Sequence, residues 1–513
     1  MKKPSFPSRR RALVTSVTAA AALVAVAVAV SPATAERSPR GNQRTAGAAD
    51  GGTVDTGSPE AISRIIGAEE AWARGWTGRG VDVAVIDTGV AKVPGLDGPG
   101  KVIDGPDLSF DAPGAAVTGL DAHGHGTFMA GLIAAKDPGS YTGVAPDSRI
   151  VNVKVGAADG AVDVSQVIAA IDWVTQHAHD PGLNIRVLSL SFGTDSVQAY
   201  ERDPLAQAAE QAWKHGIVVV AAAGNDGRGP RKLADPAYNP YVIAAGGQDP
   251  LGTLDTADDR VPDFAQHGTE DRPVDVIAPA AHVIGLRVPG SFVDAEAAGT
   301  GRVGTRYQRG SGTSQAAAIV AGGAALLLQK DPDATPDAIK HLLGSTATPL
   351  PRKEQNAHKA EKYSGHGIVN LARACEATPS GGAQGWPSSL GDGDLDKSRA
   401  GEYVQDGEVV LRGEKDIFGK PYDSASMSAA ASRAGAWNRG TWNGSRWSGD
   451  DWSGSRWSNG DWSGTSWSGS RWSGSRWSGM SWDGSRWSGD GWNGSRWTGS
   501  RWSGSRWSTM DWD

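Results

Sequence analysis

The residues of this sequence that could do chemistry include an aspartate, a histidine and a serine, far apart along the chain. Asp87 ends the run Val-Asp-Val-Ala-Val-Ile-Asp, and His125 stands in Asp-Ala-His-Gly-His-Gly-Thr. Ser314 stands in Gly-Ser-Gly-Thr-Ser-Gln-Ala-Ala-Ala, which covers residues 310–318. A carboxylate, an imidazole and a hydroxyl are the groups of nucleophilic acyl transfer, in which a base activates a weak serine nucleophile. Each of these residue types alone could equally have a structural role. Whether the three act together depends on the strands and helices that position them.

The neighbouring residues place these side chains at strand ends and helix starts. The run before Asp87 predicts a buried strand, and open parallel sheets carry their active sites at the carboxyl ends of strands. His125 and Ser314 each precede a run of small and apolar residues. The run after His125 predicts a buried helix packed closely on the sheet, and the run after Ser314 predicts a long helix of small residues. A helix N-terminus at Ser314 favours negative charge, which suits an oxyanion. Asn225 ends another apolar run, so its amide could donate to that oxyanion, with a turn role as the alternative.

The remaining histidines and the single cysteine are interpreted as solvent, loop or core residues. The sequence His-Gly-Thr recurs at His267, but charged residues follow it in place of an apolar helix. Cys375 is the only cysteine, so no intramolecular disulfide can form. The histidines without an expected chemical role are His123, His177, His179, His215, His267, His282, His341, His358 and His366.

Short apolar runs alternate with segments of helical character between Pro59 and Ala374. Residues 81–86, 150–155, 187–190, 217–222 and 242–245 form such runs, and 167–177 and 204–214 have helical character. This alternation predicts an α/β fold with a mostly parallel central sheet and helices on both faces. The net charge of -7 leaves no broad basic field, so nucleic acid is not expected as a partner.

The composition divides the chain into five segments. Residues 1–35 have a positive start, an apolar run and a closing Ala-Thr-Ala, the pattern of a secretory signal peptide, with an uncleaved membrane anchor as the alternative. Residues 36–58 predict a flexible lead-in, 59–375 the folded domain, 376–436 a linker and 437–513 a repeat region. We therefore expect a secreted protein that keeps no membrane segment after signal removal.

Six short motifs, in order, resemble the signatures of the subtilisin-like serine peptidases, the subtilase family. They are Asp-Thr-Gly at 87–89, Gly-His-Gly-Thr at 124–127, Gly-Val-Ala-Pro at 143–146, Ser-Phe-Gly at 191–193, Ala-Ala-Gly-Asn at 222–225 and Gly-Thr-Ser-Gln-Ala at 312–316. The chain order of aspartate, histidine and serine is also that of subtilisin. The resemblance covers about residues 59–374 and implies a subtilisin-like fold and a secreted serine endopeptidase.

The resemblance also implies a role for each site residue. Ser314 would attack a peptide carbonyl, His125 would take and return its proton, and Asp87 would orient the imidazole. Asn225 and the backbone amide of Ser314 would stabilise the oxyanion. Relatives often bind calcium, but no loop here has a carboxylate spacing that singles out ligands, so no metal residues are expected.

The same resemblance implies that protein or peptide substrates bind as an extended strand beside the catalytic groups. The residues expected to pair with the substrate backbone are Ser191, Phe192 and Gly193. The residues expected to line the pocket for the residue before the cut are Ala222, Ala223 and Gly224.

A tryptophan recurs at every fifth residue from Trp437 to Trp512, mostly as Trp-Ser-Gly-Ser-Arg. Such a repeat predicts a stacked β structure with layered indoles, and a flexible glycine- and serine-rich tail is the alternative. Exposed indoles would suit contact with a cell wall or polysaccharide, and a role of the tail in folding or secretion would fit as well. The rival for the whole protein is a surface-attachment or binding protein that uses an inactive peptidase scaffold, which would need none of the four catalytic groups.

Overall fold

The computed structural model describes residues 55–110, 120–227, 232–296, 301–350, 364–406 and 409–447, and the backbone of 476–477. The expected signal peptide and most of the lead-in lie outside these ranges. None of the helices in these ranges is both long and apolar enough to cross a membrane.

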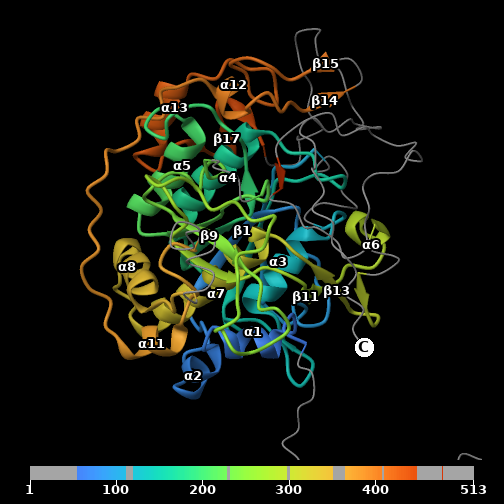
Figure 1. Cartoon of the computed structure of the whole chain (residues 1–513). Helices are drawn as coiled ribbons and strands as arrows, with labels where there is room; N and C mark the ends of the chain where they lie inside the picture. Colours follow the sequence, from blue (N-terminus) through green and yellow to red (C-terminus); the bar gives the residue numbers. More distant parts are fainter. Residues whose placement is uncertain are drawn as a thin grey trace, which may run out of the picture. The chain divides into compact units, whose positions relative to one another are not determined.

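A seven-stranded sheet with every neighbouring pair parallel forms the centre of the fold, in the order β10-β9-β8-β6-β1-β5-β2 (Figure 1). Its strands are β1 (Asp82–Asp87), β2 (Val102–Asp107), β5 (Arg149–Lys154), β6 (Ile185–Leu190), β8 (Val218–Ala222), β9 (Ile243–Gln248) and β10 (Val276–Pro279). Strands β1 and β8 are buried along their whole length, as continuous valine, isoleucine and alanine runs predict for a sheet covered on both faces. The predicted fold class is therefore confirmed.

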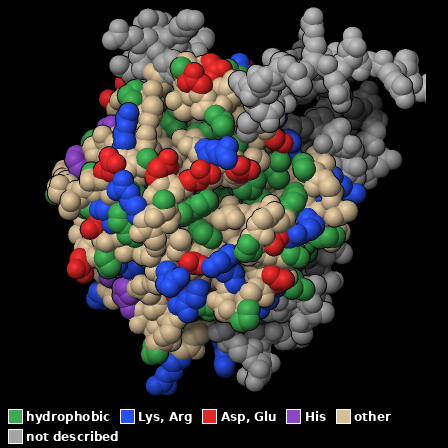
Figure 2. Space-filling view, turned by 90° about the horizontal axis from the view of Figure 1, so that it is seen from below, with side chains coloured by type: hydrophobic (Ala, Val, Ile, Leu, Met, Phe, Trp, Pro, Cys, Tyr) green, Lys and Arg blue, Asp and Glu red, His purple; other side chains and the backbone are tan. Residues whose placement is uncertain are grey.

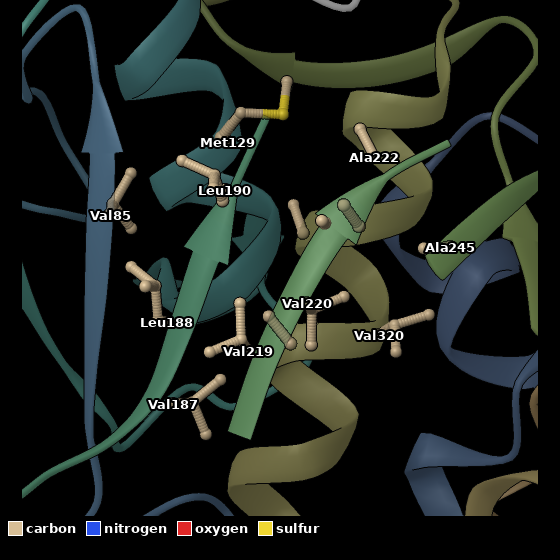
Figure 3. Close-up of a cluster of buried hydrophobic side chains, with 14 of the residues drawn as sticks. Val85, Met129, Val187, Leu188, Leu190, Val219, Val220, Ala222, Ala245 and Val320 are labelled. Carbon is tan, nitrogen blue, oxygen red and sulfur yellow. The ribbon is translucent and has the colours of Figure 1, made fainter. Parts of the chain in front are cut away.

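Two pairs of helices cover the sheet. Helix α3 (His125–Ala134) packs beside α7 (Thr313–Lys330), and α4 (Val164–His177) packs beside α5 (Pro204–Lys214). Val320 of α7 and Met129 of α3 meet sheet residues such as Leu190 and Val220 in the core (Figure 3). Gly322 lets α7 approach the segment before β5 closely, because a Cβ atom added there would lie 2.7 Å from the Cβ of Val144.

The remaining elements of residues 59–376 surround this core. The helices are α1 (Pro59–Ile65), α2 (Ala68–Ala73), α6 (Phe292–Glu296), α8 (Pro336–Thr346) and α11 (Leu371–Glu376). The strands are β3 (Lys136–Asp137), β4 (Tyr141–Thr142), β7 (Phe192–Gly193), β11 (Val283–Leu286), β12 (Arg302–Val303) and β13 (Tyr307–Gly310). Acidic and basic side chains are intermingled over the face shown in Figure 2, which carries no broad field of one sign.

The described part of the segment predicted as a linker, residues 376–406 and 409–436, contains helices and strands and packs on the domain, which differs from that expectation. It contains α12 (Leu395–Ser398), α13 (Ser424–Ala431) and the strand pair β14 (Gln405–Asp406) and β15 (Val409–Val410). In Figure 1 the chain leaves α11, runs up one side and reaches α12 and α13 above α4 and α5. Several of its apolar residues are buried, among them Leu395, Leu411 and Ile417, whereas Trp386 and Leu390 are exposed. We call residues 379–447 the C-terminal extension.

The first three tryptophan repeats fold into a small antiparallel sheet, the tryptophan meander (residues 437–447). Its strands are β16 (Trp437–Asn438), β17 (Thr441–Trp442) and β18 (Ser445–Arg446). Asn443 and Gly444 have φ values of 46° and 69°, as in the tight turn that favours Asn-Gly. The rings of Trp442 and Trp447 meet edge to face, with centroids 5.8 Å apart. Within 437–447 the structure is thus the β arrangement with packed indoles.

Candidate active site

Asp87 and His125 form a buried pair at the carboxyl end of β1. The imidazole Nδ1 lies 2.7 Å and 2.9 Å from the two carboxylate oxygens of Asp87. Each residue is only 1% exposed. The Thr88 backbone N–H also donates to the Asp87 carboxylate, at 2.8 Å. The carboxylate is therefore held in place on one side and directed at the imidazole on the other.

The close approach of α3 to the end of β1 makes this pair possible. Gly126 follows His125, and a Cβ atom added there would lie 2.2 Å from the Gly89 carbonyl oxygen and 3.1 Å from the Cβ of Asp87. Only glycine lets the helix start this near to the strand. The second glycine of the Gly-His-Gly-Thr motif, Gly126, is thus required for the contact between Asp87 and His125.

A second buried carboxylate, Asp121, organises the start of α3. It accepts from the backbone N–H groups of Gly124 at 2.6 Å and Thr127 at 2.8 Å, and from the Thr127 hydroxyl at 2.7 Å. The Thr88 hydroxyl donates to Asp121 at 2.8 Å and accepts from the Gly126 N–H at 2.9 Å. We assigned no role to this residue from the sequence. An acidic residue shortly before a helix start is the signal that could have found it.

Ser314 is the second residue of α7, which packs against α3. Asn225 lies just beyond the end of β8, and its side-chain oxygen accepts from the Thr313 N–H at 2.8 Å. The Gly224 N–H donates to the Thr313 hydroxyl at 3.1 Å. These bonds join the end of β8 to the first turn of α7. Because the amide oxygen of Asn225 faces Thr313, the NH2 group is the half of the side chain that could serve an oxyanion.

The expected substrate residues lie at the same edge of the sheet. Strands β8, β6 and β1 are neighbours, and their carboxyl ends lead to Asn225, Ser191 and Asp87 respectively. Gly193 approaches Ala234 closely, since an added Cβ atom would lie 2.7 Å from the Cβ of that alanine. The Ala234 N–H in turn donates to the Ala223 carbonyl at 3.0 Å. The segment around Ala234, which sequence reasoning missed, thus connects the two stretches expected to bind substrate.

Strand β7 carries an antiparallel partner from the same chain. The backbone of β19 (Arg476–Trp477) pairs with it, Arg476 opposite Gly193 and Trp477 opposite Phe192. An edge that accepts a strand in this way is suited to an extended peptide.

Two groups have shifted pKa values that bear on their chemistry, His123 close to His125 and Cys375 on α11. Burial, followed by the neighbouring His125, lowers the pKa of His123 to about 4. The His123 ring stacks on Phe292 with centroids 5.4 Å apart, so it is a neutral packing group near pH 7. Burial raises the pKa of the Cys375 thiol to about 11, which keeps it protonated and unreactive at neutral pH.

Among the described residues, no group of three or more His, Cys, Asp or Glu side chains is placed to hold a metal ion. In these ranges the calcium that the resemblance implies would therefore not be held by a side-chain cluster of this kind.

A family model and curated relatives place the chain in one family. The model of the subtilase family matches residues 78–368. Serine protease AprX of Bacillus subtilis (strain 168) is 38% identical over 277 residues, which are 52% of this chain and 61% of AprX, less than two thirds of its length. Subtilisin Savinase of Lederbergia lenta is 34% identical over 317 residues, which are 62% of this chain and 98% of that protein. A solved structure of a cold adapted subtilisin-like serine proteinase has 29% identity, a TM-score of 0.42, and covers 57% of this chain and 88% of its own.

Proposed function

The chain belongs to the subtilase family of serine endopeptidases, and on that premise we propose that Asp87, His125 and Ser314 are its catalytic triad. The observation that carries the proposal is the buried contact between His125 Nδ1 and Asp87, at 2.7 Å. The hydrogen bond from Thr313, the residue before Ser314, to Asn225 beyond the end of β8 supports a place for Ser314 near the same edge of the sheet. A histidine held by a carboxylate through Nδ1 presents Nε2 to a reacting hydroxyl.

In the acylation step, the Ser314 Oγ attacks the carbonyl carbon of the scissile peptide while its proton passes to His125 Nε2. Asp87 stabilises the imidazolium that forms. The Asn225 NH2 group and the Ser314 backbone N–H donate to the oxyanion of the tetrahedral intermediate. When the intermediate collapses, the C–N bond breaks and His125 gives its proton to the leaving amine. The product is an ester between Ser314 and the acyl half of the substrate.

In the deacylation step, a water molecule loses a proton to His125 and attacks the ester carbonyl. The second tetrahedral intermediate uses the same two oxyanion donors. Its collapse breaks the bond to Ser314 Oγ, which recovers the proton from His125. The carboxylic acid product leaves, and the triad returns to its starting state.

For substrate binding, we propose that Ser191, Phe192 and Gly193 pair with the substrate backbone. The partner strand β19 on β7 supports this role, because it uses the same edge. Ala222, Ala223 and Gly224 would line the pocket for the residue before the cut. Their small side chains leave room for a substrate side chain, and backbone pairing makes no demand on sequence, so broad protein substrates are expected.

Secretion and a role for the tail complete the proposal. The pattern of residues 1–35 supports export of the enzyme. Trp437, Trp442 and Trp447 are buried in the tryptophan meander, so these three indoles are not presented to a sugar. Contact with a cell wall or polysaccharide is therefore proposed only for the repeats after Trp447.

Hydrolysis of casein by the purified full chain tests the enzyme against an inactive scaffold. We expect wild-type protein to digest casein and Ser314→Ala to be slower by about 10⁶, the loss known for the corresponding serine in subtilisin. Circular dichroism should show both proteins folded. A folded wild-type protein without activity, or an equally active Ser314→Ala variant, would contradict the proposal.

A further inference from the structure

We propose that the C-terminal extension is a working part of the enzyme, which holds the substrate-binding strand β7 in place through Thr194 and Ser398. The extension lies beyond residues 78–368, the part that the subtilase model matches. The inference rests on the proposed function, because it concerns how the same site binds extended peptides.

The contact that carries the inference lies one residue beyond β7. The Thr194 hydroxyl donates to the backbone carbonyl of Ser398, at the end of α12, at 2.6 Å. The Thr194 backbone bonds on its other side to Asp235, with N–O distances of 3.1 Å and 2.9 Å. Asp235 follows Ala234, the residue in close contact with Gly193. The extension thus contacts the residue that connects β7 to the segment around Ala234.

Further bonds bind the extension to the loop between β7 and α5. The Ser398 hydroxyl lies 2.9 Å from both carboxylate oxygens of Asp203, the residue that caps α5. The Gln198 amide donates to the Asp394 carbonyl at 2.9 Å and accepts from the Asp394 N–H at 2.8 Å. Since both ends and the middle of this loop are bonded, α12 holds it along its length.

Arg399, which follows Ser398 in the chain, fixes the extension to the catalytic domain. Its side chain is fully buried and lies 2.7 Å (Nε) and 3.2 Å (Nη2) from the carboxylate of Asp163, the residue that caps α4. The same guanidinium donates to the carbonyls of Gly413 at 2.7 Å and Lys415 at 2.6 Å. A planar guanidinium can satisfy four such acceptors at once, which a lysine ammonium cannot match. Arg399 therefore ties α12, residues 413–415 and α4 together.

The physical reason for such support is the shortness of β7. A strand of two residues has little regular structure of its own, and ordering it when substrate binds has an entropic cost. Contacts that order β7 beforehand lower that cost, and they act only on substrates long enough to pair with it. The contacts of the extension given above reach the residue after β7, the loop before α5 and the start of α4, whereas His125 is oriented by Asp87, so we expect the chemical step to depend little on the extension.

The first test removes the Thr194 hydroxyl with Thr194→Val, a change of nearly the same shape. We expect KM for a four-residue peptide anilide to rise about threefold to tenfold, the loss of one hydrogen bond, with kcat within twofold. A single-residue ester with the same residue before the cut, and labelling by a small fluorophosphonate, should change less than twofold. Thr346→Val is the matched control, because it also removes a hydroxyl that donates to a backbone carbonyl, on α8. Its kinetics should be those of wild type.

The second test weakens the anchor with Arg399→Lys, which keeps the charge but loses the paired contact. Amide hydrogen exchange over residues 194–203 should become faster, and KM for the peptide anilide should rise more than KM for the ester. Arg433→Lys, at an exposed arginine of the same extension, should leave both unchanged.

Two results would overturn the inference: an unchanged KM for the peptide anilide in Thr194→Val, or equal changes for anilide and ester. Failure of the proposed function would look different, since wild-type protein would then neither react with the fluorophosphonate nor hydrolyse the ester.

Discussion

At the scale of single residues, some site residues could be predicted from the local sequence, and others become apparent only from tertiary contacts. Asp87, His125, Ser314 and Asn225 each lie at an element boundary that a short apolar run marks, so their places were predictable. Asp121 was not assigned a role, because its four bonds reach Gly124, Thr127 and Thr88 across a turn and from another strand end. A residue whose function is to hold others becomes visible only when those others are in place.

The role of Asn225 can be separated from substrate binding by kinetics. Asn225→Ala should lower kcat by about 10² to 10³, the range known for the corresponding donor in subtilisin, with little change in KM. The reason is that the oxyanion exists in the transition state and not in the bound substrate. Asn184→Ala serves as control, since this exposed residue precedes the amino end of β6, at the opposite edge of the sheet. A higher KM with unchanged kcat would assign Asn225 to substrate binding instead.

At the scale of elements, strands were predictable where apolar residues are continuous, as in β1, β5, β6, β8 and β9. The extension was not predictable in the same way. Its helix α12 has four residues, and its stability comes from distant partners such as Asp163 and Asp203. Glycine, serine and polar residues therefore looked like a linker, although Arg399 and Leu395 are fully buried.

The packing of the tryptophan meander on α4 should depend on pH through Asp172. The Trp442 indole N–H donates to the Asp172 carboxylate at 2.8 Å, and burial raises the pKa of that carboxyl to about 7. An acid with a higher pKa folded than unfolded binds its proton more tightly when folded, so this group loses stability as the pH rises from about 4 through about 7.

Asp172→Asn keeps an acceptor for the indole but removes the titration. The thermal midpoint of this variant, relative to that of wild type, should rise as the pH increases from 4 to 8. The underlying difference in the free energy of unfolding is about 1.4 kcal/mol for each unit by which the pKa of Asp172 differs between the folded and unfolded states. Below pH 4 the dependence on pH should vanish. Asp180→Asn, at an exposed aspartate beyond α4, should show no such trend. A constant difference between Asp172→Asn and wild type across the range would contradict the assignment.

At the scale of the whole molecule, the domain is followed by an extension that packs on it, where the sequence had predicted a linker. It leaves α11, passes α8 and ends in the tryptophan meander on α4 (Figure 1). The indole N–H of Trp437 donates to the Ala169 carbonyl of α4 at 2.8 Å, and Arg399 bonds to Asp163 at the start of the same helix. A chain with one cysteine cannot form an internal disulfide, and these contacts fix the extension without one.

Two truncations test this view of the molecule. A chain that ends at Trp447 keeps the contacts of Arg399 with Asp163 and of Trp437 with Ala169, so its thermal midpoint should lie within about 2 °C of that of the full chain. A chain that ends at Thr378 loses the ion pair between Arg399 and Asp163 and exposes the apolar surface under α12 and the meander to water. Its midpoint should fall by about 10 °C or more, measured at one scan rate. Equal midpoints for the two truncated chains would show that the extension is only a linker.

The most direct test of the account is the site of covalent labelling by a fluorophosphonate, located by mass spectrometry. The account predicts that the folded full chain is labelled on Ser314, that Ser314→Ala is not labelled, and that His125→Ala is labelled far more slowly, because the base is missing. A folded protein that takes up no label, or that takes it up on a different serine, would contradict the assignment of the triad.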